Sequence, residues 1–155
     1  MILVLCGTQK QSFARMIDEA KKLADEHEVI VQAGHTEYKS DKMEIFDFIS
    51  SSQLEILYDK AQYIITHAGA GSMFSAIKSK KKTIVFPRMQ KYGEHVDDHQ
   101  LQLATKLANL GYLLVFHDSD EMIQMFEKLK KFNPLPYTLE GSIPTLIDEE
   151  LEKML

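Results

Sequence analysis

Short apolar runs recur along the chain and alternate with segments of helical periodicity. The runs cover residues 1–6, 29–31, 43–49, 63–66, 83–86 and 112–116, and most of them end at glycine, proline or a polar residue. The first run, residues 1–6, is uninterrupted, which is typical of a strand that is buried on both faces. We predict six strands, one at each of these runs.

The segments between these runs have apolar residues at three- and four-residue spacing, which predicts helices. The first covers residues 11–27, where Phe13, Met16, Ile17, Ala20, Leu23 and Ala24 fall on one stripe. A second helix is expected over 53–59, capped by Ser51 or Ser52. A third runs from the glycine motif to about 79, and a fourth covers about 97–109. A fifth starts at an Asp118-Ser119 cap and ends at about 131. Strands that alternate with helices predict the α/β class, with a Rossmann-like, doubly wound parallel sheet.

The alternation of apolar runs and helical segments stops after Phe132. Residues 1–132 read as one domain, and residues 133–155 as a carboxyl-terminal extension that starts with the irregular Asn133-Pro134-Leu135-Pro136. Ile143, Leu146, Ile147, Leu151 and Leu155 share helical spacing in this extension. This amphipathic segment either folds back onto its own domain or docks on a partner.

Net charge, cysteine content and the length of the apolar runs argue against several classes of protein. The chain of 155 residues carries a net charge of −5, which argues against a general nucleic-acid binder. Its single cysteine, Cys6, lies inside the first apolar run, so we expect a buried structural thiol and a reducing compartment. No apolar stretch approaches the roughly 20 residues of a membrane span, and we expect a cytoplasmic protein.

The most distinctive motif is Thr66-His67-Ala68-Gly69-Ala70-Gly71-Ser72, between the fourth strand and the next helix. Glycines there let the backbone turn sharply, and the helix offers free amides and the positive end of its dipole. Phosphate binding is one interpretation, and a tight turn is the other. The motif matches neither the P-loop nor the dinucleotide fingerprint. Gly7-Thr8, after the first strand, repeats the arrangement in weaker form.

A third polar loop, "PRMQKYGEHVDDHQ", follows the fifth strand. His95 and His99 are four residues apart, which is a metal-ligand spacing if both lie on one helix. Asp97 and Asp98 are equally suited to the first turn of a helix. The loop is thus a metal site, a helix start, or a polar segment that contacts a ligand. Nothing in the chain resembles a nucleophilic triad.

Taken together, the glycine motif, the strand ending "FPR" and "YGEHVDDHQLQLATKLANLG" resemble the carboxyl-terminal, donor-binding half of family 28 glycosyltransferases. Within it, the chain is most similar to the PssE-like catalytic subunits of two-component exopolysaccharide glycosyltransferases and to their eukaryotic N-acetylglucosaminyltransferase-subunit relatives. The opening "GTQKQSFARMIDEA" is similar to the family's first loop and helix. The resemblance covers about residues 1–116.

The resemblance implies half of a GT-B glycosyltransferase, with a UDP-sugar lying across the strand ends. The diphosphate would meet the amides of Gly69, Ala70, Gly71 and Ser72, with Gly7 and Thr8 opposite and His67 beside it. The sugar would meet the third loop; the residues assigned to this pocket are Arg88, Glu94, His95, His99 and Gln100. One departure is Ser75, which stands where the family pattern has an acidic residue for the ribose.

The resemblance to two-component enzymes also implies that donor binding and acceptor binding lie on different subunits. This chain would stabilise the leaving diphosphate without a metal or other cofactor. A membrane-associated partner subunit would hold the lipid-linked acceptor, recruit the chain to the inner face of the membrane and supply the general base. No catalytic residue is therefore assigned, and His67 and His95 are the histidines to test as bases.

The sequence thus predicts a hexosyltransferase subunit that uses a UDP-sugar in exopolysaccharide or capsule synthesis. A non-catalytic nucleotide-binding or regulatory module with a GT-B-like pocket is the alternative, and Ser75 favours it. A hydrolase that uses a metal held by His95, Asp98 and His99 is a third hypothesis.

Overall fold

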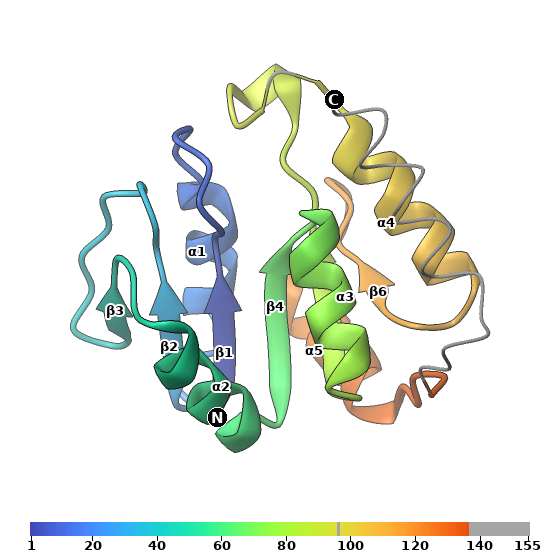
Figure 1. The fold of residues 1–155 in the computed structure, drawn as a ribbon, viewed down its shortest axis with the longest axis horizontal. Helices are drawn as coiled ribbons and strands as arrows, with labels where there is room; N and C mark the ends of the chain where they lie inside the picture. The colour runs from blue at the N-terminus through green and yellow to red at the C-terminus, as the bar shows by residue number, and fades with distance from the viewer. Residues whose placement is uncertain (96, 137–155) are drawn as a thin grey trace.

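The strands of the protein form one parallel sheet (Figure 1). The structure is a computed structural model that describes residues 1–95 and 97–136. Its strands are β1 (Ile2–Leu5), β2 (Val29–Gln32), β3 (Glu44–Phe46), β4 (Tyr63–His67), β5 (Lys82–Phe86) and β6 (Leu114–Val115). The order across the sheet is β3-β2-β1-β4-β5-β6, and all neighbours are parallel. This is the doubly wound order of a Rossmann-type sheet, as predicted.

Helices cover both faces of the sheet. They are α1 (Ala14–Lys21), α2 (Ser51–Lys60), α3 (Ala70–Lys78), α4 (His99–Asn109) and α5 (Met122–Lys131), with a short 3-10 helix, η1 (Gln90–Tyr92). Figure 1 shows α1 and α5 behind the sheet, and α2, α3 and α4 in front of it. The chain therefore changes sides between α1 and α3, which follow the neighbouring strands β1 and β4.

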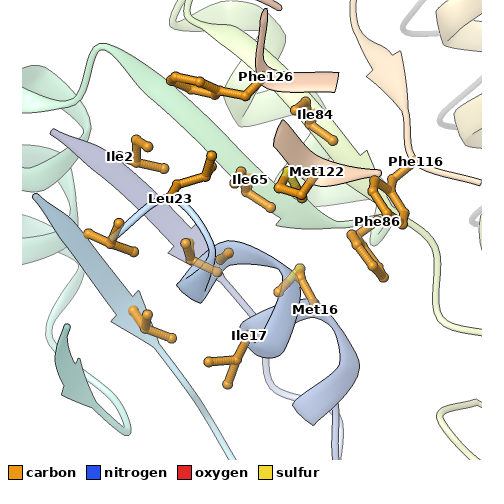
Figure 2. Packing of buried hydrophobic residues seen from close by; sticks show 14 of the residues in the cluster. Ile2, Met16, Ile17, Leu23, Ile65, Ile84, Phe86, Phe116, Met122 and Phe126 are labelled. Carbon is orange, nitrogen blue, oxygen red and sulfur yellow. The ribbon is translucent and has the colours of Figure 1, made fainter. Parts of the chain in front are cut away.

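The largest part of the core lies between the sheet and the α1–α5 layer (Figure 2). Met16 of α1 and Met122 of α5 pack beside Ile65 and Ile84 of the central strands, and all four are fully buried. Each such side chain contributes about 1.5 to 3 kcal/mol through burial of its apolar surface. Cys6 belongs to this cluster, and burial raises the pKa of its thiol to about 12, which confirms the predicted structural thiol.

Several predicted helix boundaries were wrong. The first helix begins at Ala14, after the Phe13 amide, which donates to the Thr36 hydroxyl at 2.8 Å. It ends at Lys21, because the amides of Lys22, Leu23 and Ala24 bond three residues back and form tighter turns. The cap of α2 is Ser50: its hydroxyl accepts from the Gln53 amide, and the Gln53 side chain accepts from the Ser50 amide in return.

The start of α5 also differs from its prediction. This helix begins at Met122 after Glu121, and no side chain caps it. The predicted capping residue, Asp118, contacts Lys91 and Tyr92 instead.

The chain after α5 returns toward the end of α4, where the Leu135 amide donates to the Gly111 carbonyl at 3.0 Å. The predicted helix over 143–155 lies outside the described residues. Among the described residues, no helix is both long and apolar enough to cross a membrane.

Candidate functional site

A crevice is expected where the chain order of a doubly wound sheet reverses, at the carboxyl ends of the strands. In this sheet the reversal falls between β1 and β4, whose following helices lie on opposite faces (Figure 1). The segments that leave these two strands are Gly7-Thr8 and the turn from His67 to Ser72. The topology therefore brings the two predicted phosphate loops together.

His67 lies beneath this junction, and 6% of its surface is exposed. Its Nε2 is 2.9 Å from the Ser72 hydroxyl, and its Nδ1 accepts a hydrogen bond from the Gly69 amide at 3.2 Å. Burial lowers the pKa of His67 to about 4, and the charges of Arg88 and His95 act in the same direction. The imidazole is thus neutral at pH 7, and both of its nitrogens already have partners, so it is poorly placed to serve as a general base.

The glycines of both loops make room for this imidazole. A Cβ atom added to Gly7 would lie 2.4 Å from His67 Nε2, and one added to Gly69 would lie 2.4 Å from His67 Cε1. Gly7 also has a φ of +77°, which disfavours any residue with a side chain. Gly71 differs from both, because an added Cβ would meet nothing within 4 Å. The two glycines of the motif therefore have different purposes: Gly69 fits the histidine, and Gly71 keeps the crevice open.

Gln32, at the end of β2, holds the first loop in place. Its Oε1 accepts from the Gly7 amide at 3.1 Å, and its Nε2 donates to the carbonyls of Gly7 and Asp47 at 3.2 and 2.9 Å. Sequence reasoning missed this residue, although a glutamine directly after the apolar Val29-Ile30-Val31 was a usable signal.

A pocket of about 230 Å³ opens at the junction. Gly7 and Thr8 line it from the β1 side, and Gly71, Ser72 and Ser75 line it from α3. The remaining walls are largely apolar and were not anticipated: Leu5, Gln32, Phe48, Ile49, Leu54 and Tyr58. A polar end beside a helix amino terminus thus faces an apolar end of the same cavity.

Ser75 also lines a second, more open hollow of about 480 Å³ between α2 and α3. Glu55, Asp59 and Lys78 are the charged residues of this hollow. Ser75 therefore lies between the pocket and a surface that carries carboxylates.

Arg88 does not line this pocket; it ties three segments together. Its guanidinium donates to the carbonyls of Gln11, Glu94 and Cys6 at 2.7, 3.0 and 2.9 Å, and stacks 4.5 Å from the Phe13 ring. Burial lowers the pKa of this guanidinium, and 1% of the residue's surface is exposed. The structure gives Arg88 an internal role in holding the loop after β5.

Glu94 of the same loop and Gln100 in the first turn of α4 are both buried. The Glu94 carboxylate accepts two hydrogen bonds from Arg15, at 2.9 and 2.8 Å, and one from the Met89 amide at 3.0 Å. The Gln100 side chain accepts from the Arg88 amide at 3.2 Å. These side chains fix the shape of the loop.

His95 and His99, half-buried, are the remaining predicted site residues. Helix α4 begins at His99, so His95 precedes the helix and the condition for a shared helical face is not met. The described residues include no group of three or more His, Cys, Asp or Glu side chains that could hold a metal ion.

Comparisons with known proteins agree with this geometry. Residues 1–140 match the glycosyltransferase family 28 C-terminal domain. The UDP-N-acetylglucosamine transferase subunit ALG13 of Candida albicans is 28% identical over 134 residues, which cover 75% of this chain and 44% of the relative. The Candida glabrata subunit of the same name is 27% identical over 126 residues, with 80% and 60% covered. The chain spans about half the length of these curated relatives.

Solved structures share the fold. The solution structure of an ALG13 has a TM-score of 0.60 at 19% identity, with 94% of each chain covered. Acinetobacter baumannii MurG has a TM-score of 0.60 at 18% identity, with 97% of this chain and 51% of that chain covered. The sequence match extends over most of the chain, and we conclude that the protein belongs to the family 28 glycosyltransferase C-terminal domains.

Proposed function

We propose that this chain is the donor-binding, catalytic subunit of a two-component glycosyltransferase. It moves a hexosyl group from a UDP-sugar to a lipid-linked acceptor in exopolysaccharide or capsule synthesis. The observation that carries the proposal is the pocket in which Gly7-Thr8 faces the amino terminus of α3. Because relatives are named for UDP-N-acetylglucosamine transfer, N-acetylglucosamine is the first sugar to test.

The polar end of the pocket suits the diphosphate. The first amides of α3, from Ala70 to Ser72, have no partner within the helix and point toward its amino terminus. Together with the helix dipole they stabilise the charge that develops on the departing nucleoside diphosphate. The residues that line the pocket include no carboxylate, whereas protein sites for a Mg²⁺-bridged diphosphate usually contribute one or two carboxylates. The proposed reaction is therefore metal-independent.

The apolar end suits the base and ribose. Phe48, Ile49, Leu54 and Tyr58 offer a surface on which a flat base loses its contact with water. Ser75 meets the ribose with a hydroxyl in place of the carboxylate of the family pattern. The sugar extends toward His95 and His99, while Glu94 and Gln100 support that loop from behind.

The acceptor side of the reaction belongs to a partner. The solved glycosyltransferases that share this fold include chains about twice as long, such as MurG, of which this chain covers 51%. A second, membrane-associated subunit completes the cleft, binds the lipid-linked acceptor, and supplies the general base. Recruitment by that subunit brings this cytoplasmic chain to the inner face of the membrane. The segment 143–155, outside the described residues, remains a candidate docking element, and packing on its own domain is the alternative.

One observation favours the alternative of a non-catalytic nucleotide-binding module. Ser75 removes the carboxylate that would hold the ribose, and the pocket lining supplies no other. Such a module would bind nucleotides without supporting transfer.

A transfer assay separates the two. Washed membranes of the source cells receive labelled UDP-N-acetylglucosamine with or without the purified chain, and label in extracted lipid is counted. The proposal predicts incorporation that requires the chain, persists in EDTA, and is lost with Gly71→Val, which fills the crevice, but not with Gln124→Val on the exposed side of α5. UDP binding without any incorporation would favour the non-catalytic module.

A further inference from the structure

The hydrogen bonds around His67 define which of its nitrogens carries the proton. The Gly69 amide can only donate, so Nδ1, 3.2 Å away, must be the unprotonated acceptor. In a neutral imidazole the proton then lies on Nε2. Because Nε2 is 2.9 Å from the Ser72 hydroxyl, it donates to Ser72 Oγ.

The surroundings keep the ring in this form. The charged and titratable groups that act on it are Arg88 and His95, from the segment after β5. The Cys6 thiol, directly after β1, remains uncharged at neutral pH because burial raises its pKa to about 12. A protonated ring would set Nδ1–H against the Gly69 N–H, donor against donor. The Nδ1–H tautomer would meet the same conflict with the Gly69 N–H. Gly7 and Gly69 let the ring lie this close to both loops, because a Cβ on either would lie 2.4 Å from it.

The protonated Nε2 of His67 determines the direction in which the Ser72 hydroxyl can donate. A serine hydroxyl has one proton to donate, and Ser72 Oγ already accepts from His67. Its own proton is therefore free to point away from His67, and Ser72 lines the pocket beside Gly71. A ligand that meets this hydroxyl meets a donor, which suits an oxygen that can only accept, such as that of a phosphate diester.

We propose that His67 is a positioning residue that holds the Ser72 hydroxyl as a hydrogen-bond donor to the diphosphate of the nucleotide sugar. The inference rests on the proposed function and deepens it: the histidine acts through Ser72, without touching the ligand and without carrying charge. His67 thus differs from a cationic histidine, which would bind the diphosphate directly and would titrate with it.

The direction of the hydrogen bonds can be measured in the unliganded wild-type protein. Long-range ¹H–¹⁵N correlation spectra of the His67 ring distinguish the two tautomers and the protonated form. We expect the Nε2–H tautomer throughout pH 5.5 to 8, and an Nδ1–H or doubly protonated ring at pH 7 would overturn the inference. His67→Gln identifies the His67 signal among the six histidines.

The coupling to Ser72 is tested by a double-mutant cycle on UDP affinity. Loss of one hydrogen bond to a charged ligand weakens binding about tenfold or more, which is the effect we expect for Ser72→Ala. His67→Asn, whose shorter side chain no longer reaches Ser72, should weaken binding to a similar extent, and His67→Gln should restore part of it. The double variant His67→Asn/Ser72→Ala should bind no more weakly than Ser72→Ala alone, whereas multiplicative losses would contradict the inference.

Inorganic pyrophosphate as a second probe separates this inference from the proposed function. If the wild type binds pyrophosphate but shows no preference for UDP, the UDP-sugar function fails, and the same cycle with pyrophosphate still decides the role of His67. If the wild type binds neither probe at millimolar concentration, both fail.

Discussion

The fit between His67 and two glycines leads to a prediction that can be worked out atom by atom. Gly69 has an ordinary φ of −65°, so Gly69→Ala changes only the contact with the ring. Gly93 has a φ of +68° and open space around its Cα, so Gly93→Ala changes only the backbone strain. Gly7→Ala combines both effects, and Gly71→Ala has neither. The four variants separate contact from strain.

The magnitudes follow from the structure. A non-glycine residue at positive φ costs about 1 to 2 kcal/mol, which is the whole loss expected for Gly93→Ala. Moving the buried ring by enough to relieve a 2.4 Å overlap breaks its two hydrogen bonds, at about 0.5 to 1.5 kcal/mol each, so Gly69→Ala should lose about 1 to 3 kcal/mol. Gly7→Ala should then lose about 2 to 5 kcal/mol. Gly71→Ala should be neutral, or stabilising by up to about 1 kcal/mol.

Urea unfolding at pH 7, followed by circular dichroism, gives the four free energies of unfolding. The decisive comparison is Gly7→Ala against Gly93→Ala, because the two share the strain and differ in the ring contact. Equal losses for these two, together with a Gly69→Ala variant as stable as the wild type, would refute the packing of His67 between the two loops.

Three further predictions concern buried groups. Folding lowers the pKa of His67 from 6.5 to about 4, so between these values the unfolded chain binds a proton that the folded chain excludes. The free energy of unfolding should therefore fall as the pH drops below 6.5, by up to about 2 kcal/mol at pH 5. Urea unfolding of the wild type and of His67→Gln at pH 5 and 7 measures this loss, which should be absent in the variant. The Cys6 thiol, with its pKa raised to about 12, should not react with iodoacetamide at pH 8 until urea unfolds the chain; rapid labelling of the folded protein would show that it is accessible. Arg88→Met leaves three backbone carbonyls without their donors and should lower the free energy of unfolding by about 2 to 4 kcal/mol, whereas a variant as stable as the wild type would show that Arg88 is not a structural link.

The fold could be predicted from the sequence because its strongest signals are local. Ile2–Leu5 and Lys82–Phe86 are almost wholly buried, so their apolar runs stand out against the polar segments between them. The ends of helices were predicted less well. Phe13 has helical spacing with Met16 and Ile17, yet its amide bonds to Thr36, 23 residues away, and no local pattern contains that contact.

In the site too, features set by local sequence could be predicted, and features set by distant contacts could not. The glycine motif was readable because the turn and the helix amides are local consequences of the chain. Glu94 and Arg88 look like ligand-binding residues in a polar loop, but their partners Arg15 and Cys6 are 79 and 82 residues away. The sequence likewise places His67 in the motif without showing that the Gly7 loop packs against it. Tertiary contacts of this kind decide whether a polar side chain faces a ligand or the interior.

The most direct test of the central claim is an NMR titration of the ¹⁵N-labelled chain with UDP, with ADP and UMP as controls, up to millimolar ligand. Amide shifts centred on Gly7, Thr8, Gly71 and Ser72, strong for UDP and weak for ADP, are the result we predict. Equal shifts for UDP and ADP, or UDP shifts that avoid these four amides, would contradict a donor site for a UDP-sugar between β1 and α3.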